Sequence, residues 1–388
     1  GYSGSTGSGA GILDLSGANA DSRGIPDLLS VSNLYLGYGY YAAGTLKLPG
    51  SLKTLEVRNG LYLGYGAAAA NAGAVGTLDC GAGSGLTNLT VLGNFYLGAN
   101  NAVRGEIQNL PTNVAVAVGR SNAPVVMYIG SHVGNAAGKS EGRLTLSNGT
   151  FTAYLSDLRV GEGCTGNLGE NGTGVLDLAT STVQIGDEPN KIKNLPKLYI
   201  GNGSRADGTL RLPPTLTDIT VGEFILGKWA FNGSGEGTSV NAARGTLDIG
   251  SNSMLRTFTA TNGFYMATAH AVYGRIGFQN DTNFCDYLPT GLVFTAGMPG
   301  GTVPFHLGVP GIYSFNRIPI YARLALSNGV FRGYLSELRV AYNQTSYGEP
   351  NSLLDLATSS VQVGNESNQI KVAYFTVGGV GTLVGSAG

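Results

Sequence analysis

The sequence predicts an all-β protein, a right-handed parallel β-solenoid with no helical domain and about 33 residues in each of about 11–12 coils. Three observations lead to this fold class. A short element recurs along the chain, apolar residues alternate with polar ones at period two, and no stretch shows the 3.6-residue spacing of a helix. The right hand follows from the crossover rule for parallel strands.

The recurring unit contains three short strand-like stretches. The first reads Gly-Thr-Leu-x-Leu or close to it, and most of its copies begin 29 to 37 residues apart. The second is an apolar-alternating stretch such as residues 86–91, and the third is of the type Leu-Tyr-Leu-Gly. One unit cannot bury its own apolar face, so successive units must stack. A propeller blade is the alternative assignment for each unit.

The inward positions of the first stretch are its third and fifth residues, which a pleated strand directs to the same side. The third residue is Leu or Ile in every copy. The fifth is Cys80 in one copy, and we expect this cysteine to be a small core residue. Cys164 and Cys285 stand at spacings that match neither a metal site nor a disulfide framework.

A longer repeat of five units overlies the short one. Residues 143–160 and 323–340 agree at 13 of 18 positions, and residues 176–185 and 354–363 agree at 8 of 10. We therefore expect one continuous solenoid with three internal divisions. These are a first five-coil repeat at 1–163, a second at 164–342, and the start of a third at 343–388.

Composition and charge argue against two classes of partner. Charged residues make up 12% of the chain and the net charge is −1, so no basic field is present to hold a phosphate backbone. No apolar stretch approaches the ~20 residues that a membrane-spanning helix needs. We expect neither a nucleic-acid partner nor a membrane span.

An acidic column on the outside of the first stretch is where a metal or acid–base site would form. The position between the two inward residues alternates in charge from coil to coil, as in Asp14, Lys47 and Asp79. Coils stack about 4.8 Å apart, so unlike charges lie side by side. We interpret the column as ion-pair ladders rather than as a calcium site or a polysaccharide-cleaving carboxylate pair. We expect no catalytic, cofactor-binding or metal-binding residues, and therefore no enzyme.

The middle residue of the Leu-Tyr-Leu-Gly stretch should face outward, and it is tyrosine in six copies. Two roles fit. The rings could form an exposed strip that stacks on sugar rings or on another subunit, or they could stack on one another and stabilise the sheet. The predicted surface ladder consists of Tyr35, Tyr62, Tyr96, Tyr128, Tyr199 and Tyr265.

One unit is longer than the others and rich in aromatic residues and proline. It begins at Gly274 and extends over 48 residues, whereas a solvated turn should be rich in Gly, Asn and Ser. We expect segment 279–321 to pack against an adjacent subunit, with Phe305, Tyr313 and Phe315 as the assembly contact. The alternative is that these aromatic side chains fold back into the solenoid's own core.

Eight Asn-x-Ser/Thr sequons would be acceptors for N-glycans if the chain passes through a eukaryotic secretory route. They begin at Asn88, Asn148, Asn171, Asn202, Asn232, Asn280, Asn343 and Asn365.

The order of the stretches resembles a known repeat. Residues 198–203 (Leu-Tyr-Ile-Gly-Asn-Gly) followed by 208–212 (Gly-Thr-Leu-Arg-Leu) are similar to the LYVGNxGxGTLxI repeats of autotransporter-type and adhesin-type secreted bacterial β-solenoid surface proteins. The resemblance covers nearly the whole chain. It implies a solenoid architecture and a surface location, but the repeats serve as scaffolds for many activities. The steps Leu48-Pro49 and Leu212-Pro213 and the five-unit repeat depart from the usual pattern.

The expected function is that of an extracellular or cell-surface structural protein, a rigid rod that forms a filament or surface layer. Its expected partners are copies of itself, head to tail and laterally, and surface glycans. An adhesin that binds glycans through the tyrosine ladder is the first alternative, and a polysaccharide-active β-helix enzyme is the second. Because the chain starts and stops within the repeat pattern, we expect it to continue as a longer polypeptide or as a head-to-tail polymer.

Overall fold

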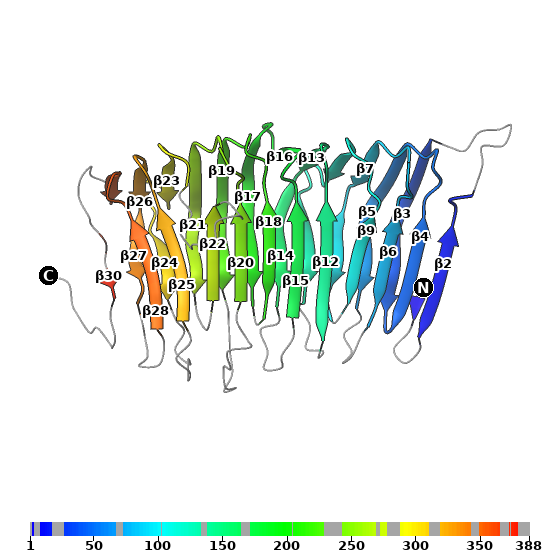
Figure 1. Ribbon diagram of the computed structural model, residues 1–388, viewed down its shortest axis with the longest axis horizontal. Coiled ribbons are helices and arrows are strands. Elements are labelled where there is room, and N and C mark those ends of the chain that lie inside the picture. The colour runs from blue at the N-terminus through cyan, green and yellow to red at the C-terminus, as the bar shows by residue number, and fades with distance from the viewer. Residues whose placement is uncertain are drawn as a thin grey trace.

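The computed structural model consists of thirty strands and contains no helix in the part of the chain that it describes. The strands stand side by side along one long axis, from β2 at one end to β30 at the other (Figure 1). The described residues are 2–3, 8–17, 27–66, 73–101, 103–132, 138–163, 171–203, 205–228, 243–268, 272–277, 288–309, 319–342, 349–364, 372 and 374–378. The expectation of an all-β protein is confirmed.

The Gly-Thr-Leu stretches form one sheet of eleven strands. Its strands are β2 (Gly9–Asp14), β4 (Ala42–Lys47), β6 (Val75–Asp79), β9 (Arg104–Gln108), β12 (Lys139–Thr145), β15 (Asn171–Asp177), β18 (Asp207–Arg211), β20 (Ala243–Asp248), β22 (Val272–Gly277), β25 (Pro319–Ala325) and β28 (Glu349–Asp355).

The other two stretches of each unit form a second sheet of nineteen strands. Its strands are β1 (Tyr2–Ser3), β3 (Leu28–Gly39), β5 (Thr54–Tyr65), β7 (Asn88–Val91), β8 (Asn94–Ala99), β10 (Ala115–Val118), β11 (Val125–Ser131), β13 (Thr150–Ala153), β14 (Leu155–Glu162), β16 (Thr182–Ile185), β17 (Lys191–Asn202), β19 (Asp218–Lys228), β21 (Thr257–Thr268), β23 (Val293–Ala296), β24 (Val303–Val309), β26 (Val330–Gly333), β27 (Leu335–Val340), β29 (Ser360–Val363) and β30 (Tyr374–Val377).

The ladders in both sheets are parallel and join each stretch to its equivalent in the next unit. Leu46 pairs with Leu78 in the eleven-stranded sheet, and Tyr62 pairs with Tyr96 in the other. Pairing also continues from the first long repeat into the second, through Leu144 and Leu176. Two continuous parallel sheets do not fit the propeller alternative, which would require a separate small sheet for each blade.

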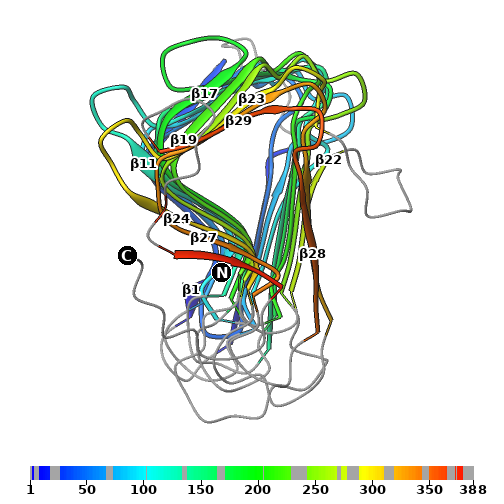
Figure 2. The ribbon, with the colours of Figure 1, turned by 90° about the vertical axis from the view of Figure 1, so that its left-hand side faces the viewer.

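The core lies between the two sheets. Viewed along the long axis, the nineteen-stranded sheet bends and forms two sides of the interior, and the eleven-stranded sheet forms the third (Figure 2). The pairing of β3 with β5 has a register shift between Val31 and Asn33. The buried apolar side chains form one cluster that extends from Leu36 to Val363. Each unit thus contributes one layer to a shared core, as stacked repeats require.

The predicted inward column is buried from Leu46 to Leu247 and again at Leu324, and Leu354 is partly buried. The burial of Ile276 and Leu383 lies outside the described residues. Leu13 is 58% exposed, because β2 pairs with β4 only and no described layer covers its other side. Cys80 is fully buried, which confirms that it is a core residue. Burial, with a smaller contribution from Asp79, raises the pKa of its thiol to about 12, so the thiol is not a nucleophile at neutral pH.

Phenylalanine fills much of the core in the second long repeat. Phe264 and Phe305 stack with their ring centroids 4.8 Å apart, and both are fully buried. This corrects the expectation that Phe305 is an assembly contact, because its strand places it in register with Phe264 inside the core. The alternative, that aromatics of this unit fold back inward, holds for Phe294 and Phe305. Tyr313 and Phe315 lie outside the described residues, so their predicted contact stays a prediction.

In most of the described units, two glycines meet where the sheets approach each other. Gly64 has φ of 59°, and a Cβ there would lie 1.9 Å from the carbonyl oxygen of Arg104. A Cβ on Gly76 would lie 2.2 Å from both the backbone nitrogen of Gly64 and the carbonyl oxygen of Leu36. The backbones of the two sheets are therefore in direct contact at this edge, which we call the glycine corner. The left-handed φ and the close approach both require glycine.

Candidate functional site

The acidic column of the eleven-stranded sheet consists of ion pairs between adjacent layers. Lys47 lies 2.8 Å from Asp14, and Arg211 lies 2.7 Å from Asp177. The hydrogen bond from Lys47 is the main reason that the pKa of Asp14 is lowered to about 2. Within the described residues, no three His, Cys, Asp or Glu side chains gather as metal ligands would. Asp14 and Asp177 are each held by a cation, whereas Asp79 accepts a hydrogen bond from the Asn109 amide at 2.8 Å. Contacts of this kind between layers are the arrangement of a stabilising ladder.

We expect Asp177→Asn to lower the free energy of unfolding by about 0.5–1.5 kcal/mol, because it removes a partly buried ion pair while keeping the shape of the side chain. Urea denaturation followed by circular dichroism measures this change. Calcium titration by calorimetry should give the same result before and after the substitution. A calcium-binding isotherm that disappears in the variant would show that Asp177 is a metal ligand.

The first four tyrosines of the predicted ladder lie in adjacent layers on the outside of the nineteen-stranded sheet. Tyr35 and Tyr62 stack at 4.7 Å between centroids, and Tyr62 and Tyr96 stack at 5.1 Å. Tyr96 meets Tyr128 edge to face at 5.4 Å. Tyr35 is 44% exposed, and the other three are half-buried. Burial is the main reason that the pKa of Tyr96 is raised to about 12.

A second, shorter column of rings stands beside the first. Tyr38 and Tyr65 stack at 5.4 Å, and the ring of Tyr62 meets each of them edge to face, at 6.0 and 5.3 Å. The ring faces of this surface are therefore largely occupied by one another, which leaves little flat area for a sugar ring. This geometry favours the stabilising role of the ladder over the glycan-binding role.

The ladder continues through an arginine. Arg159 is in register between Tyr128 and Tyr199, and its guanidinium lies 4.7 and 5.4 Å from their ring centroids. It also lies 2.8 Å from Asp157 and 2.7 Å from Glu162. The Arg159 side chain is 19% exposed and each carboxylate 9%. Burial lowers the pKa of Arg159, but the hydrogen bonds and charges of the two carboxylates outweigh it and raise that pKa above its ordinary value.

Two tyrosine hydroxyls connect the rings to these charges. The Tyr128 hydroxyl donates to Asp157 at 3.2 Å, and the Tyr199 hydroxyl donates to Glu223. Tyrosine rings, the guanidinium and the carboxylates form a continuous network across adjacent layers. Each charged group of this network thus has a partner, as burial of charge requires.

The last predicted tyrosine, Tyr265, lies two layers beyond Tyr199, with the buried Ile225 between them. The Lys228 amine lies 3.9 Å from the centroid of the Tyr265 ring, and His306 meets that ring edge to face at 5.3 Å. Burial lowers the pKa of His306 even though the carboxylate of Glu337 lies 2.5 Å away. The predicted ladder is thus divided into an aromatic part and a mixed part.

The charged cluster around Arg159 was not predicted from the sequence. The sequence does contain one indication of this cluster. In some units the tyrosine position of the Leu-Tyr-Leu-Gly stretch is taken by a basic residue, as at Arg159, His306 and Arg339. The carboxylates that hold these cations lie a few residues before or after the tyrosine position, on the same strand or on the strand of the next layer. The cluster is therefore evident only once the layers are placed in register.

The predicted glycosylation sequons fall in different places. Asn88 and Asn148 are exposed, whereas Asn171 and Asn202 are half-buried within strands β15 and β17. The side-chain amide of Asn202 donates to Glu162 at 3.3 Å. Of the described sequons, Asn88 and Asn148 are therefore the accessible ones. Asn232, Asn280, Asn343 and Asn365 lie outside the described residues.

The eleven-stranded sheet opens at one step of each long repeat. Pairing between β9 and β12 stops at Glu106 and Arg143, although β12 and β15 stay paired as far as Thr145 and Asp177. A polar cavity of about 320 Å³ lies at this opening. The equivalent step from β22 to β25 pairs at two positions only, so the opening belongs to the five-unit repeat. The cavity is lined by Glu106, Ile107, Gln108, Asn109, Arg143 and Thr145.

No family model, curated protein or solved structure matches the chain. The described residues include no helix that is long and apolar enough to cross a membrane.

Proposed function

We propose that the chain is an extracellular or cell-surface structural protein, a right-handed parallel β-solenoid rod that assembles with copies of itself into a filament or surface layer. The single observation that carries the proposal is the continuous register of parallel strands across eleven layers of the eleven-stranded sheet. Such a ladder resists bending, because every layer is hydrogen-bonded to the next. The resemblance to secreted bacterial solenoid repeats supports the surface location.

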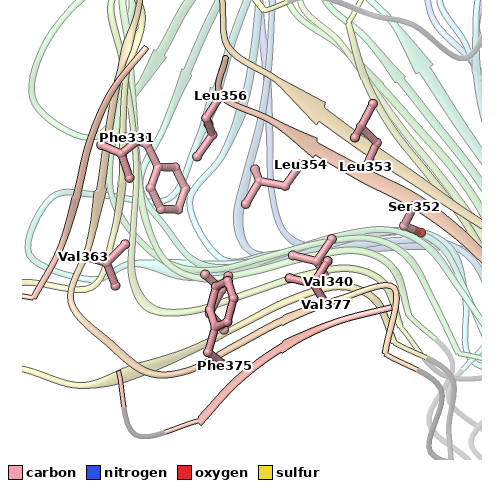
Figure 3. Close-up of a pocket in the computed structure, with 11 residues that line it drawn as sticks. Phe331, Val340, Ser352, Leu353, Leu354, Leu356, Val363, Phe375 and Val377 are labelled. Atoms are coloured by element: carbon pink, nitrogen blue, oxygen red, sulfur yellow. The ribbon is translucent and has the colours of Figure 1, made fainter. Parts of the chain in front are cut away.

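The two end layers support contacts between copies. Ile12 and Leu13 at one end are 72% and 58% exposed, and Phe375 and Val377 at the other are 54% and 60% exposed. Figure 3 shows Phe331, Leu354, Leu356 and Phe375 around an apolar cavity of about 240 Å³ in the last described layers. Exposed apolar area of this kind is a recognised sign of association.

Negative-stain imaging and small-angle scattering of the purified chain test the proposal. We expect rods about 50 Å long per copy, from eleven layers at ~4.8 Å, which associate end to end as the concentration rises. Phe375→Asp should shorten the assemblies, whereas Asn148→Asp, on an exposed turn, should not.

Replacing Tyr313 and Phe315 with serine should abolish lateral assembly. Compact particles without elongation, at every concentration, would contradict the rod.

Immunolabelling of intact source cells tests the location separately. Labelling of unpermeabilised cells is the expected result, and labelling that needs permeabilisation would contradict a surface protein. The glycan-binding alternative has weaker support, since the tyrosine rings are stacked on one another.

A further inference from the structure

The position after the left-handed glycine carries three reactive groups in consecutive layers. Glu162 pairs with Asn202, and Asn202 pairs with Lys228. Residues that are paired in parallel ladders direct their side chains to the same side, about 4.8 Å apart. A carboxylate, a carboxamide and a primary amine therefore follow one another along this column.

Side chains of this column contact one another between adjacent layers from Ser131 to Asn202. The Ser131 hydroxyl donates to Oε2 of Glu162 at 2.7 Å, and Nδ2 of Asn202 donates to Oε1 of Glu162 at 3.3 Å. Tyr38 and Tyr65 occupy the same column nearer the N-terminus and stack on each other. The carboxylate thus touches the nitrogen of Asn202 that would leave if another amine attacked the carboxamide carbon.

The amine of Lys228 has the surroundings of a nucleophile. It lies over the ring of Tyr265 and makes no ion pair with any described residue, although Glu223 is near enough to act on it through its charge. Burial lowers the pKa of this amine, which increases the neutral fraction. Only the neutral amine has the free electron pair that attack on a carbonyl carbon requires.

We propose that Lys228 and Asn202 form an isopeptide bond, with Glu162 as the proton carrier. Nζ of Lys228 attacks Cγ of Asn202, the bond from Cγ to Nδ2 breaks, and a new amide joins the two side chains. A proton from Nζ passes through the Glu162 carboxylate to Nδ2, which leaves as ammonia. One amine and one carboxamide give one secondary amide and one ammonia, so no oxidant or other reactant is needed.

The attack needs a change of side-chain rotamer in Lys228. Its amine now points to the layer of Tyr265, and Asn202 lies in the layer on the other side. The unbranched lysine side chain has several rotatable bonds, and rotation about them is fast compared with bond formation. Once formed, the bond would join β17 to β19 covalently and resist separation of these two layers.

Intact mass spectrometry of the purified, denatured chain tests the bond. We expect a mass lower than the sequence mass by one ammonia, and a proteolytic product in which the peptide containing Asn202 is linked to the peptide containing Lys228. A wild-type mass equal to the sequence mass would by itself overturn the proposal, without measurement of any variant.

Variants identify the origin of the ammonia. Lys228→Arg should restore the full mass, whereas Lys197→Arg, which changes an exposed lysine of β17, should keep the loss. Asn202 precedes Gly203 and could also lose ammonia by closing a succinimide, so a loss that persists in Lys228→Arg would overturn the proposal. Glu162→Gln should give mainly unlinked chain, and full linkage in that variant would overturn the role of Glu162.

Discussion

Gly98→Ala is expected to lower the free energy of unfolding by about 3–5 kcal/mol, from the left-handed backbone and the overpacking together. Gly98 lies in the glycine corner with φ of 58°, and a Cβ there would lie 1.7 Å from the carbonyl oxygen of Glu141. The obstacle is backbone of the facing sheet, which cannot rotate away as a flexible side chain could. The two sheets would have to separate locally. Urea denaturation measured by circular dichroism gives the change.

Two matched variants separate the causes. Gly83 also has a positive φ, 74°, but a Cβ there would meet nothing within 4 Å, so Gly83→Ala should cost only about 1–2 kcal/mol. Ala267 occupies the corner position of its unit with φ of 47°, and Ala267→Gly should stabilise the chain by about 1 kcal/mol. If Gly98→Ala lowered the free energy of unfolding no more than Gly83→Ala does, that result would contradict the close contact between the two sheets.

Much of the fold could be predicted because the repeat is regular. Alternation in the Gly-Thr-Leu stretch gave the inward column, and Leu78, Leu144 and Leu176 are fully buried. The glycine corner could not be predicted in the same way. Its glycines mark turns in any repeat, and only the three-dimensional stacking brings Gly64 against Gly76.

The candidate site could be predicted only in part. Alternation placed Tyr62 and Tyr96 on the outside, but it could not tell that each ring would be covered by the next. Whether the rings stack on one another or stay open to a ligand depends on their orientation. The alternation of apolar and polar residues along a strand does not determine that orientation. Phe305 was misassigned because the unusual length and proline content of its unit hid an ordinary strand, β24, that continues the core.

Arg159→Met is expected to lower the free energy of unfolding by about 3–5 kcal/mol, because it leaves two carboxylates with little exposure and no cation. The substitution keeps an unbranched apolar side chain between Tyr128 and Tyr199, so the packing changes less than the charge. Arg143→Met is the matched control. Arg143 is exposed and donates to Thr145 at 3.3 Å, so its loss should change the stability by less than about 0.5 kcal/mol.

The charge itself can be tested by removing the anions as well. Adding Asp157→Asn and Glu162→Gln to Arg159→Met takes away the buried negative charge that the arginine balances. Replacing a whole buried ion cluster by neutral groups is often tolerated, whereas removing one partner is not. We therefore expect the triple variant to be more stable than Arg159→Met alone in the same urea titration. A triple variant as unstable as the single one would mean that Arg159 acts through its contacts with the tyrosine rings, at 4.7 and 5.4 Å, and not through its ion pairs.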